Sequence, residues 1–207
     1  MSTPDTTTSL TPTTRLATSE DDRIKTLAHA AFVGDPVFHC FGSFRKHLEP
    51  VTNVKGSDNL RRFLRFLSNT CCLSGGRITV ALFKNAGEED KVVAAPFWLP
   101  PNKHLVLWKV PTPIRARVIP ILERWGLAGL MRIRFDSSHA ALEKGYKGKG
   151  SKESPDASWY LQLIMTDPEY QGQSHLVREA FPHAPNSIFT LELTTSKSRD
   201  QYLHLGF

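Results

Sequence analysis

Apolar residues recur along the chain at two spacings, one typical of helices and one typical of strands. Spacings of three and four residues, as on one face of a helix, mark 19–32 and 60–71. Short runs that alternate or are continuously apolar predict strands at 78–83, 92–99, 159–165 and 188–193. A last short helix is expected from Ser196 to Leu205. The pattern therefore predicts helices and strands interleaved along the chain.

Polar and glycine residues mark where the first helices begin and end. Ser19 and the three acidic residues after it supply capping oxygens, and Gly34-Asp35-Pro36 breaks the first helix. Residues 37–44 are expected to form a compact, aromatic-rich second helix or turn. Asp58 is expected to cap the third helix, which Gly75-Gly76 stops.

The strands at 78–83 and 92–99 are predicted to form a hairpin. The polar run 85–90 between them has the composition of a turn. Pro96 lies inside the second strand and has no N–H to donate, so it implies a bulge or an edge position.

The second half of the chain mixes helical and loop patterns. A helix from Ile114 is expected to bend or restart near Pro120, and another helix is expected at 127–135. Glycine, lysine and serine dominate residues 144–157, which predicts a mobile loop.

The stretch from Trp159 to Gln173 joins a buried strand to a short polar loop. Its apolar run ends at Asp167-Pro168 and predicts a strand with both faces covered. A helix is expected to follow at 174–181 and to end at Pro182. Strand, glycine-bearing loop and helix N-terminus in this order form a common anion site, because free backbone N–H groups converge there. An ordinary strand-to-helix turn is the alternative.

Length and composition frame the organisation of the domain. The chain has 207 residues and 40% hydrophobic content, enough for one good core. Residues 1–14 hold seven threonines and almost nothing apolar, so we expect a disordered tail before a single domain at 15–207. No apolar run is long enough for a membrane span and no signal-peptide layout begins the chain, which predicts a cytoplasmic protein without a membrane partner. Cys40, Cys71 and Cys72 are most simply reduced, buried thiols.

Positive charge is concentrated in one part of the chain. Residues 101–150 contain ten Lys or Arg and three Asp or Glu, a net charge of +7, while the whole chain carries +6. This stretch could face phosphates or an acidic partner, and a solvated helix face is the alternative. No aromatic-interleaved pattern accompanies the charge, so nucleic-acid binding is not predicted. The eight histidines show no ligand-like spacing, and no metal site is predicted.

Four blocks in this order resemble the GCN5-related N-acetyltransferases, in particular their small fungal and bacterial members. The blocks are Asp35-Pro36-Val37-Phe38, the run 92–101, the run 159–173, and the run 191–207 that ends in Gly206-Phe207. The resemblance covers roughly residues 15–207. It implies an α/β fold with a mixed central sheet flanked by helices, in which the strands around Leu163 and Leu191 run parallel and splay apart.

The resemblance also implies where acetyl-CoA binds as co-substrate. A splayed edge leaves backbone N–H and C=O groups open, and the pantetheine arm can pair with them like an added strand. The positions that correspond are Leu163, Ile164, Met165 and Thr166. The pyrophosphate would rest on the N–H groups of Gln171, Gly172, Gln173, Ser174, His175 and Leu176.

Two side chains match the chemistry of acetyl transfer to a primary amine of a small molecule or a peptide. Tyr202, four residues before Gly206, matches the tyrosine that many family members place near the CoA sulfur as general acid. A core tyrosine that packs the last helix is the alternative. Glu192 is the candidate for receiving the amine's proton, and a carboxylate that holds a backbone loop is its competitor.

The chain departs from the family pattern at two places. Ser174 and Leu176 stand where the family loop has small residues, and about three loop residues are missing when the chain is aligned on the following helix. A catalytically inactive relative that acts as a binding or interaction module is therefore the alternative function. The sequence given stops at Phe207, before a further strand that the family has, so we expect an open sheet edge and self-association through it.

Overall fold

The computed structural model describes part of the chain. The described residues are 13–18, 21–32, 54–83, 90–103, 114–120, 122–123, 143–148, 154–170, 175–192 and 196–205. The expected second helix at 37–44, the helix at 127–135, Cys40 and most of the predicted tail lie outside these residues.

Five strands form one mixed sheet in the order β1-β2-β3-β4-β5. Their bounds are β1 Thr13–Leu16, β2 Arg77–Phe83, β3 Lys91–Leu99, β4 Trp159–Thr166 and β5 Phe189–Leu191. The first four strands pair antiparallel with their neighbours, and β5 pairs parallel with β4. The mixed α/β sheet that the resemblance implied is confirmed.

Strand β1 begins inside the segment that we predicted to be a disordered tail. Thr13 pairs with Leu82 and Leu16 pairs with Thr79, so the last residues of that segment extend the sheet. The prediction was wrong for Thr13 and Thr14, because a threonine-rich composition also suits a strand once a partner strand is available.

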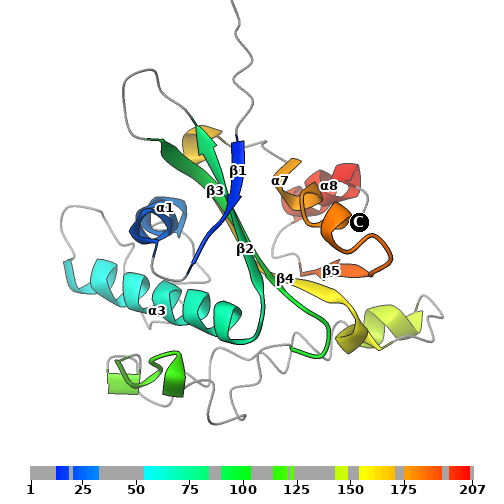
Figure 1. Cartoon of the computed structure of the whole chain (residues 1–207), viewed down its shortest axis with the longest axis horizontal. Helices are drawn as coiled ribbons and strands as arrows, with labels where there is room; N and C mark the ends of the chain where they lie inside the picture. The colour runs from blue at the N-terminus through cyan, green and yellow to red at the C-terminus, as the bar shows by residue number, and fades with distance from the viewer. Residues whose placement is uncertain are drawn as a thin grey trace, which may run out of the picture.

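Helices cover both faces of the sheet (Figure 1). On one face lie α1, Asp22–Phe32, and α3, Val54–Leu73; on the other lie α7, His175–Arg178, and α8, Ser196–Leu205. The predicted last helix is confirmed at both ends. We call these the α1 face and the α7 face of the sheet.

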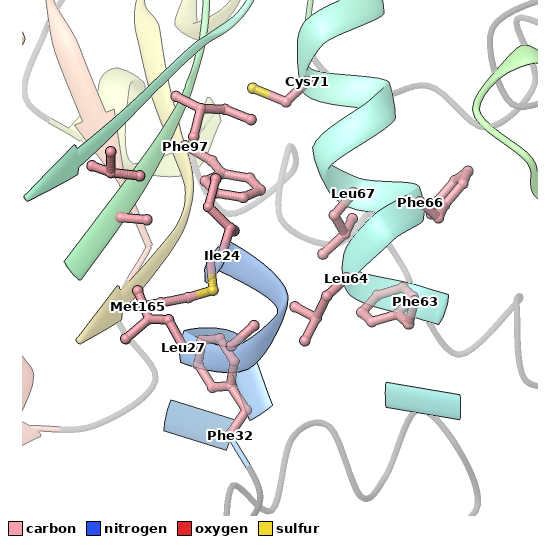
Figure 2. Packing of buried hydrophobic residues seen from close by; sticks show 14 of the residues in the cluster. Ile24, Leu27, Phe32, Phe63, Leu64, Phe66, Leu67, Cys71, Phe97 and Met165 are labelled. Atoms are coloured by element: carbon pink, nitrogen blue, oxygen red, sulfur yellow. The ribbon is translucent and has the colours of Figure 1, made fainter. Parts of the chain in front are cut away.

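The main core fills the space between the sheet and the two helices of the α1 face. Figure 2 shows Phe97 and Met165 of the sheet turned toward Ile24 and Leu27 of α1, with Leu64 and Leu67 reaching in from α3. A smaller cluster on the α7 face gathers Trp98, Leu161, Val177 and Ala180. β3 and β4 therefore contribute apolar side chains to both faces, as the central strands of a sheet do.

Helix α3 starts one turn earlier than the sequence suggested and stops where predicted. Asp58 lies inside the helix, where its carboxylate accepts a hydrogen bond from Arg62 Nε at 2.8 Å, so its assignment as the cap was wrong. At the other end Gly75 has φ +76°, and Gly75 N and Gly76 N donate to the carbonyls of Cys72 and Cys71. These two bonds form a Schellman motif, which satisfies carbonyls that the helix leaves open.

Pro96 interrupts a ladder in the middle of the sheet. β3 lies between β2 and β4, so the edge position offered by the sequence is wrong. The register of β3 with β2 has partners at Phe97 and Ala94 and none at the two residues between them. A residue without an N–H cannot complete the ladder there. The nearest bulge does not lie on β3: the register of β3 with β4 shifts between Phe97 and Trp98, where the extra residue is on β4, and Pro96 itself pairs with Ile164.

Two further expectations differ from the structure, and a third is confirmed. Residues 143–148 are helical within the predicted mobile loop, and Lys147 lies 3.5 Å from Glu143 one turn away, a pair that favours a helix despite two glycines. The expected helix from Ile114 turns at Arg117, φ +66°, and restarts at Ile119, next to Pro120, so the restart alternative is confirmed. Cys71 is buried, whereas Cys72 is exposed. No helix in the described parts of the chain is long and apolar enough to span a membrane.

Candidate functional site

Strand β4 extends five residues beyond its pairing with β5. Trp159, Tyr160 and Leu161 pair with β5, and the last pair is Leu161 with Leu191. On its other side β4 stays paired with β3 as far as Thr166. We call Trp159–Leu161 the closed half of β4 and Leu163–Thr166 its open half. Within the described residues, no strand pairs with the open half on the β5 side.

A one-residue bulge at Gln162 separates the two halves. Phe97 pairs with Leu163 and Trp98 with Leu161, so Gln162 is an extra residue on β4. Backbone bonds agree: Trp159 N donates to Ile188 O next to β5, whereas Asp167 N donates to Val93 O on β3. In a regular strand these two residues, an even number apart, would face the same neighbour. The extra residue therefore reverses the alternation.

Side chains show the same reversal. Tyr160 packs on the α1 face and Leu161 on the α7 face. Beyond the bulge, Leu163 and Met165 pack on the α1 face and Ile164 on the α7 face. Tyr160 and Leu163 share a face although they are three residues apart, which strict alternation forbids.

The bulge decides which backbone groups of the open half face away from β3. Counting back from Asp167, the N–H and C=O groups of Met165 and Leu163 face β3, and those of Ile164 and Thr166 face the unpaired side. Of the four residues proposed from the sequence, Ile164 and Thr166 therefore present the groups that an extended ligand could pair with. Met165 is fully buried in the main core.

Charged side chains fix the chain where it leaves β4. Lys91 Nζ lies 3.0 Å from Asp167 Oδ2, 3.2 Å from Glu169 Oε2 and 4.9 Å from the centre of the Tyr170 ring. The carboxylate of Asp167 also accepts a hydrogen bond from Glu169 N at 3.0 Å. The short helix η2, Pro168–Tyr170, is thereby attached to the start of β3.

The predicted phosphate loop is described only at its end. Gln171, Gly172, Gln173 and Ser174 lie outside the described residues, and α7 begins at His175. The expected helix at 174–181 is shorter, since α7 ends at Arg178 and Pro182 lies inside the next short helix, η3, Phe181–His183. The proline fits because it occupies a first-turn position of η3. Leu176 is 1% exposed and packs on Ala81, Val93 and Ala94, so its side chain faces the sheet.

Ionic contacts fasten the segment after the loop to the sheet and to the last helix. Glu179 accepts hydrogen bonds from Arg77 Nη2 at 2.6 Å and from Thr79 Oγ1 at 2.9 Å, both on β2. Arg178 Nη2 donates to His204 O of α8 at 3.0 Å. These contacts hold α7 against the sheet and next to α8.

Tyr202 lies on the α7 face. It is half-buried and packs against the cluster of Trp98, Leu161, Val177 and Ala180. Burial raises the pKa of its phenol. The hydroxyl is therefore protonated at neutral pH, as a proton donor must be.

Glu192 lies on the α1 face, one residue beyond the end of β5, and it is exposed. Thr190 pairs with Tyr160, so Glu192, two residues further, points to the same face as Tyr160. Burial, followed by the charge of Glu192 and a hydrogen bond to it, raises the pKa of Tyr160. The structure thus joins Glu192 to Tyr160 and places Tyr202 on the opposite face of the sheet.

Tyr160 and Gln162 were missed by sequence reasoning as candidate site residues. Gln162 is a polar residue within an apolar strand, and that contrast was the available signal. Tyr160 carried no such signal, because its link to Glu192 depends on the register of β4 with β5. No three His, Cys, Asp or Glu side chains gather to hold a metal ion among the described residues.

The fold resembles that of a solved acetyltransferase structure. No protein-family model and no curated protein matches the sequence. A crystal structure described as histone acetyltransferase HPA2 and related acetyltransferase from Corynebacterium glutamicum superposes with a TM-score of 0.59. The two chains are 21% identical, and the match covers 94% of this chain and 83% of that chain. The protein therefore has the fold of this acetyltransferase structure, in agreement with its mixed sheet flanked by helices.

Proposed function

We propose that this protein transfers an acetyl group from acetyl-CoA to a primary amine. The observation that carries the proposal is the open half of β4. Ile164 and Thr166 present N–H and C=O groups on the side where β5 has ended, and no strand among the described residues pairs with them. An extended amide-bearing chain pairs with such groups as an added strand does. The pantetheine arm of CoA carries two amides and has this form.

The transfer requires two proton movements around one substitution at the thioester carbon. The neutral amine nitrogen attacks the carbonyl carbon, the C–S bond breaks, and the sulfur leaves as a thiolate. Tyr202, whose phenol is protonated at neutral pH as an ordinary tyrosine is, gives its proton to the thiolate. The proton released by the attacking nitrogen goes to Glu192, which is exposed and can pass it to solvent.

An inactive binding module is the second candidate, and the length of α7 favours it. The helix that follows the phosphate loop has only four residues. A single helical turn sums few peptide dipoles, so its N-terminus attracts a phosphate less strongly than a longer helix does. Such a protein would bind acyl-CoA weakly or not at all.

Amide signals and calorimetry during titration with acetyl-CoA decide between the two. We expect the largest shifts at Ile164 and Thr166, whose N–H groups face away from β3, and smaller ones at Leu163 and Met165, whose N–H groups face β3. Absence of any shift at millimolar acetyl-CoA would reject the transferase and leave the binding module.

Turnover separates the role of Tyr202 from simple packing. Tyr202→Phe is expected to lower kcat by about tenfold to a hundredfold and to leave KM for acetyl-CoA nearly unchanged, because the proton donor acts on the developing thiolate. Leu203→Ala on the exposed side of α8 is the matched control, since Leu203 is 57% exposed. Equal kcat values for Tyr202→Phe and the wild type, with chemistry rate-limiting, would remove the role.

A further inference from the structure

We infer that Tyr160, Gln162 and Glu192 form the seat for the ammonium group of the acceptor, which selects primary amines over alcohols. The inference rests on the proposed function, since it assigns the acceptor side of the same site. Its basis is that the bulge and the β4–β5 register bring three polar side chains to one face of the sheet beside the open half of β4.

The first step is the placement of Gln162. Counting forward from Tyr160 puts the side chain of Gln162 on the α1 face, and counting back from Met165 puts Leu163 there as well. The bulge therefore turns two consecutive side chains to the same face. Gln162 is partly buried, and its Oε1 atom is buried without a hydrogen-bond partner in the described part of the chain.

A buried amide oxygen without a partner is costly. Leaving such a group unpaired disfavours the folded state, and native proteins pair nearly all of them. Gln162, which carries this oxygen, immediately precedes the open half of β4. A ligand that donates a hydrogen bond there would satisfy it.

The second step is the pair of Tyr160 and Glu192. Tyr160 lies on β4 opposite Thr190, and Glu192 lies two positions after Thr190, one residue beyond β5, on the same face. An aromatic and a long side chain reach each other at this offset. The Tyr160 hydroxyl is hydrogen-bonded to the Glu192 carboxylate. A tyrosine that donates to a carboxylate keeps oxygen lone pairs available, and the carboxylate has further acceptor positions.

The third step is the chemical character of the group. It offers the amide oxygen of Gln162, the hydroxyl oxygen of Tyr160 and the carboxylate of Glu192, all of which accept hydrogen bonds. An ammonium group has three N–H donors, a positive charge and no acceptor, whereas an alcohol has one donor and two lone pairs. The set therefore complements a primary ammonium ion and leaves an alcohol poorly satisfied.

The probe is n-butylammonium chloride, with n-butanol as the neutral molecule of matched length. We expect butylammonium to shift the side-chain amide of Gln162 and the backbone amides of 160–163 and 192 in the wild-type protein, and n-butanol at the same concentration to shift them little. This measurement needs no variant. Equal shifts with both probes, or none with either, would overturn the inference.

Three variants then test the individual groups. Tyr160→Phe, Gln162→Leu and Glu192→Gln each remove one acceptor or its charge, and each is expected to raise the amine's KM or Kd by about tenfold, the size of one hydrogen bond to a charged group. KM for acetyl-CoA is expected to change less than twofold. Asp200→Asn, which neutralises an exposed carboxylate on α8, is the control. Unchanged amine constants in all three folded variants, checked by thermal midpoint, would also overturn the inference.

The two proposals fail in different ways. If acetyl-CoA binds and the amine is acetylated but the three variants behave as the wild type, the acceptor seat is rejected and the transferase stands. If acetyl-CoA does not bind but butylammonium still shifts Gln162, the transferase is rejected and the ammonium seat stands.

Discussion

The two halves of β4 are made of similar apolar residues and end up in opposite situations. The closed half is hydrogen-bonded on both sides, and aromatic rings pack beside it. The centre of the Phe189 ring lies 5.3 Å from that of Trp98, 6.5 Å from that of Trp159 and 4.8 Å from that of Phe181. The open half is bonded to β3 and to no other strand among the described residues. The difference comes from β5, which pairs with three residues of β4 and then ends.

This contrast separates the part of β4 that serves stability from the part to which the proposed function assigns binding. In the closed half, the backbone groups are satisfied by the protein and the side chains bury apolar area, so changes there act on folding. In the open half, the side chains still bury apolar area, while the backbone groups of Ile164 and Thr166 that face away from β3 pair with no strand among the described residues. The following predictions test that division, from the largest effect to the smallest.

Removing the indole ring of Trp98, which lies on β3 opposite the closed half, is expected to have the largest effect on folding. Trp98 is fully buried and meets Phe189 edge to face. Trp98→Ala should lower the free energy of unfolding by about 3–5 kcal/mol through lost burial and the cavity left behind. Chemical denaturation measures it, and Leu203→Ala, at an exposed position, should change it by about 0.5 kcal/mol or less. Similar losses in both variants would contradict the assignment of Trp98 to the core.

A hydroxyl pair offers a second comparison between the halves. Next to the closed half, Ser158 Oγ lies 2.8 Å from Thr190 Oγ1 and donates to Pro155 O at 2.6 Å, in a buried setting. Ser158→Ala should cost about 1–2 kcal/mol, since it removes buried hydrogen bonds. Thr166→Val in the open half should cost about 0.5 kcal/mol or less. Thermal unfolding measures both losses of stability. Equal losses for Ser158→Ala and Thr166→Val would contradict the division between the two halves of β4 as far as hydroxyl groups are concerned.

The ion pairs at the end of the open half should contribute less. The Lys91 side chain is 40% exposed, so Lys91→Met is expected to cost about 0.5–1 kcal/mol at neutral pH. The hydrogen bond that Lys91 donates to Asp167 raises the pKa of Lys91, burial opposes this, and the hydrogen bond donated to Glu169 adds to it.

The sign of that pKa shift fixes its pH dependence. A raised pKa in the folded state stabilises the protein fully below the ordinary lysine value of about 10.4, and the contribution disappears as pH rises through the folded pKa. The difference between wild type and Lys91→Met should therefore be constant from pH 7 to about 10 and shrink above it. Unfolding curves at several pH values check this, and a difference that grows at alkaline pH would contradict it.

The smallest expected effect is on the ionisation of two tyrosines, Tyr160 on the α1 face and Tyr202 on the α7 face. Burial raises the pKa values of Tyr160 and Tyr202, with Glu192 adding to the first. Both phenols should therefore ionise above the ordinary value of about 10 in an ultraviolet absorbance titration, and Tyr160→Phe should remove the most alkaline part of the curve. If Tyr160→Phe instead removed the part of the titration curve near pH 10, the phenol of Tyr160 would be exposed to solvent.

Much of the fold was readable from the sequence, because it depends on local pattern. Helix periodicity located the end of α1 at Phe32 and the stop of α3 at Gly75-Gly76, and alternation located β2 and β3. Strand β1 was missed because threonines without apolar neighbours also fit a tail. The start of α3 was misplaced because the side chain of Asp58 pairs with Arg62 instead of capping.

The candidate site was readable in outline only. The family resemblance implied an open strand edge at Leu163 to Thr166, yet which backbone groups face that edge depends on a bulge that no local sequence pattern predicts. The link between Tyr160 and Glu192 depends on the register of two strands separated in sequence by about thirty residues. Long-range register is set by packing, so it becomes visible only in the folded chain.

The bulge at Gln162 makes β4 tolerant to the loss of one residue at this point. Deleting Gln162 would join Leu161 directly to Leu163 and leave the pairs of Trp98 with Leu161 and of Phe97 with Leu163 in place. Strict alternation would then run through the whole strand, with Met165 still in the core on the α1 face and Ile164 still on the α7 face. A deletion at this single point therefore shortens β4 without exchanging the faces of its remaining side chains.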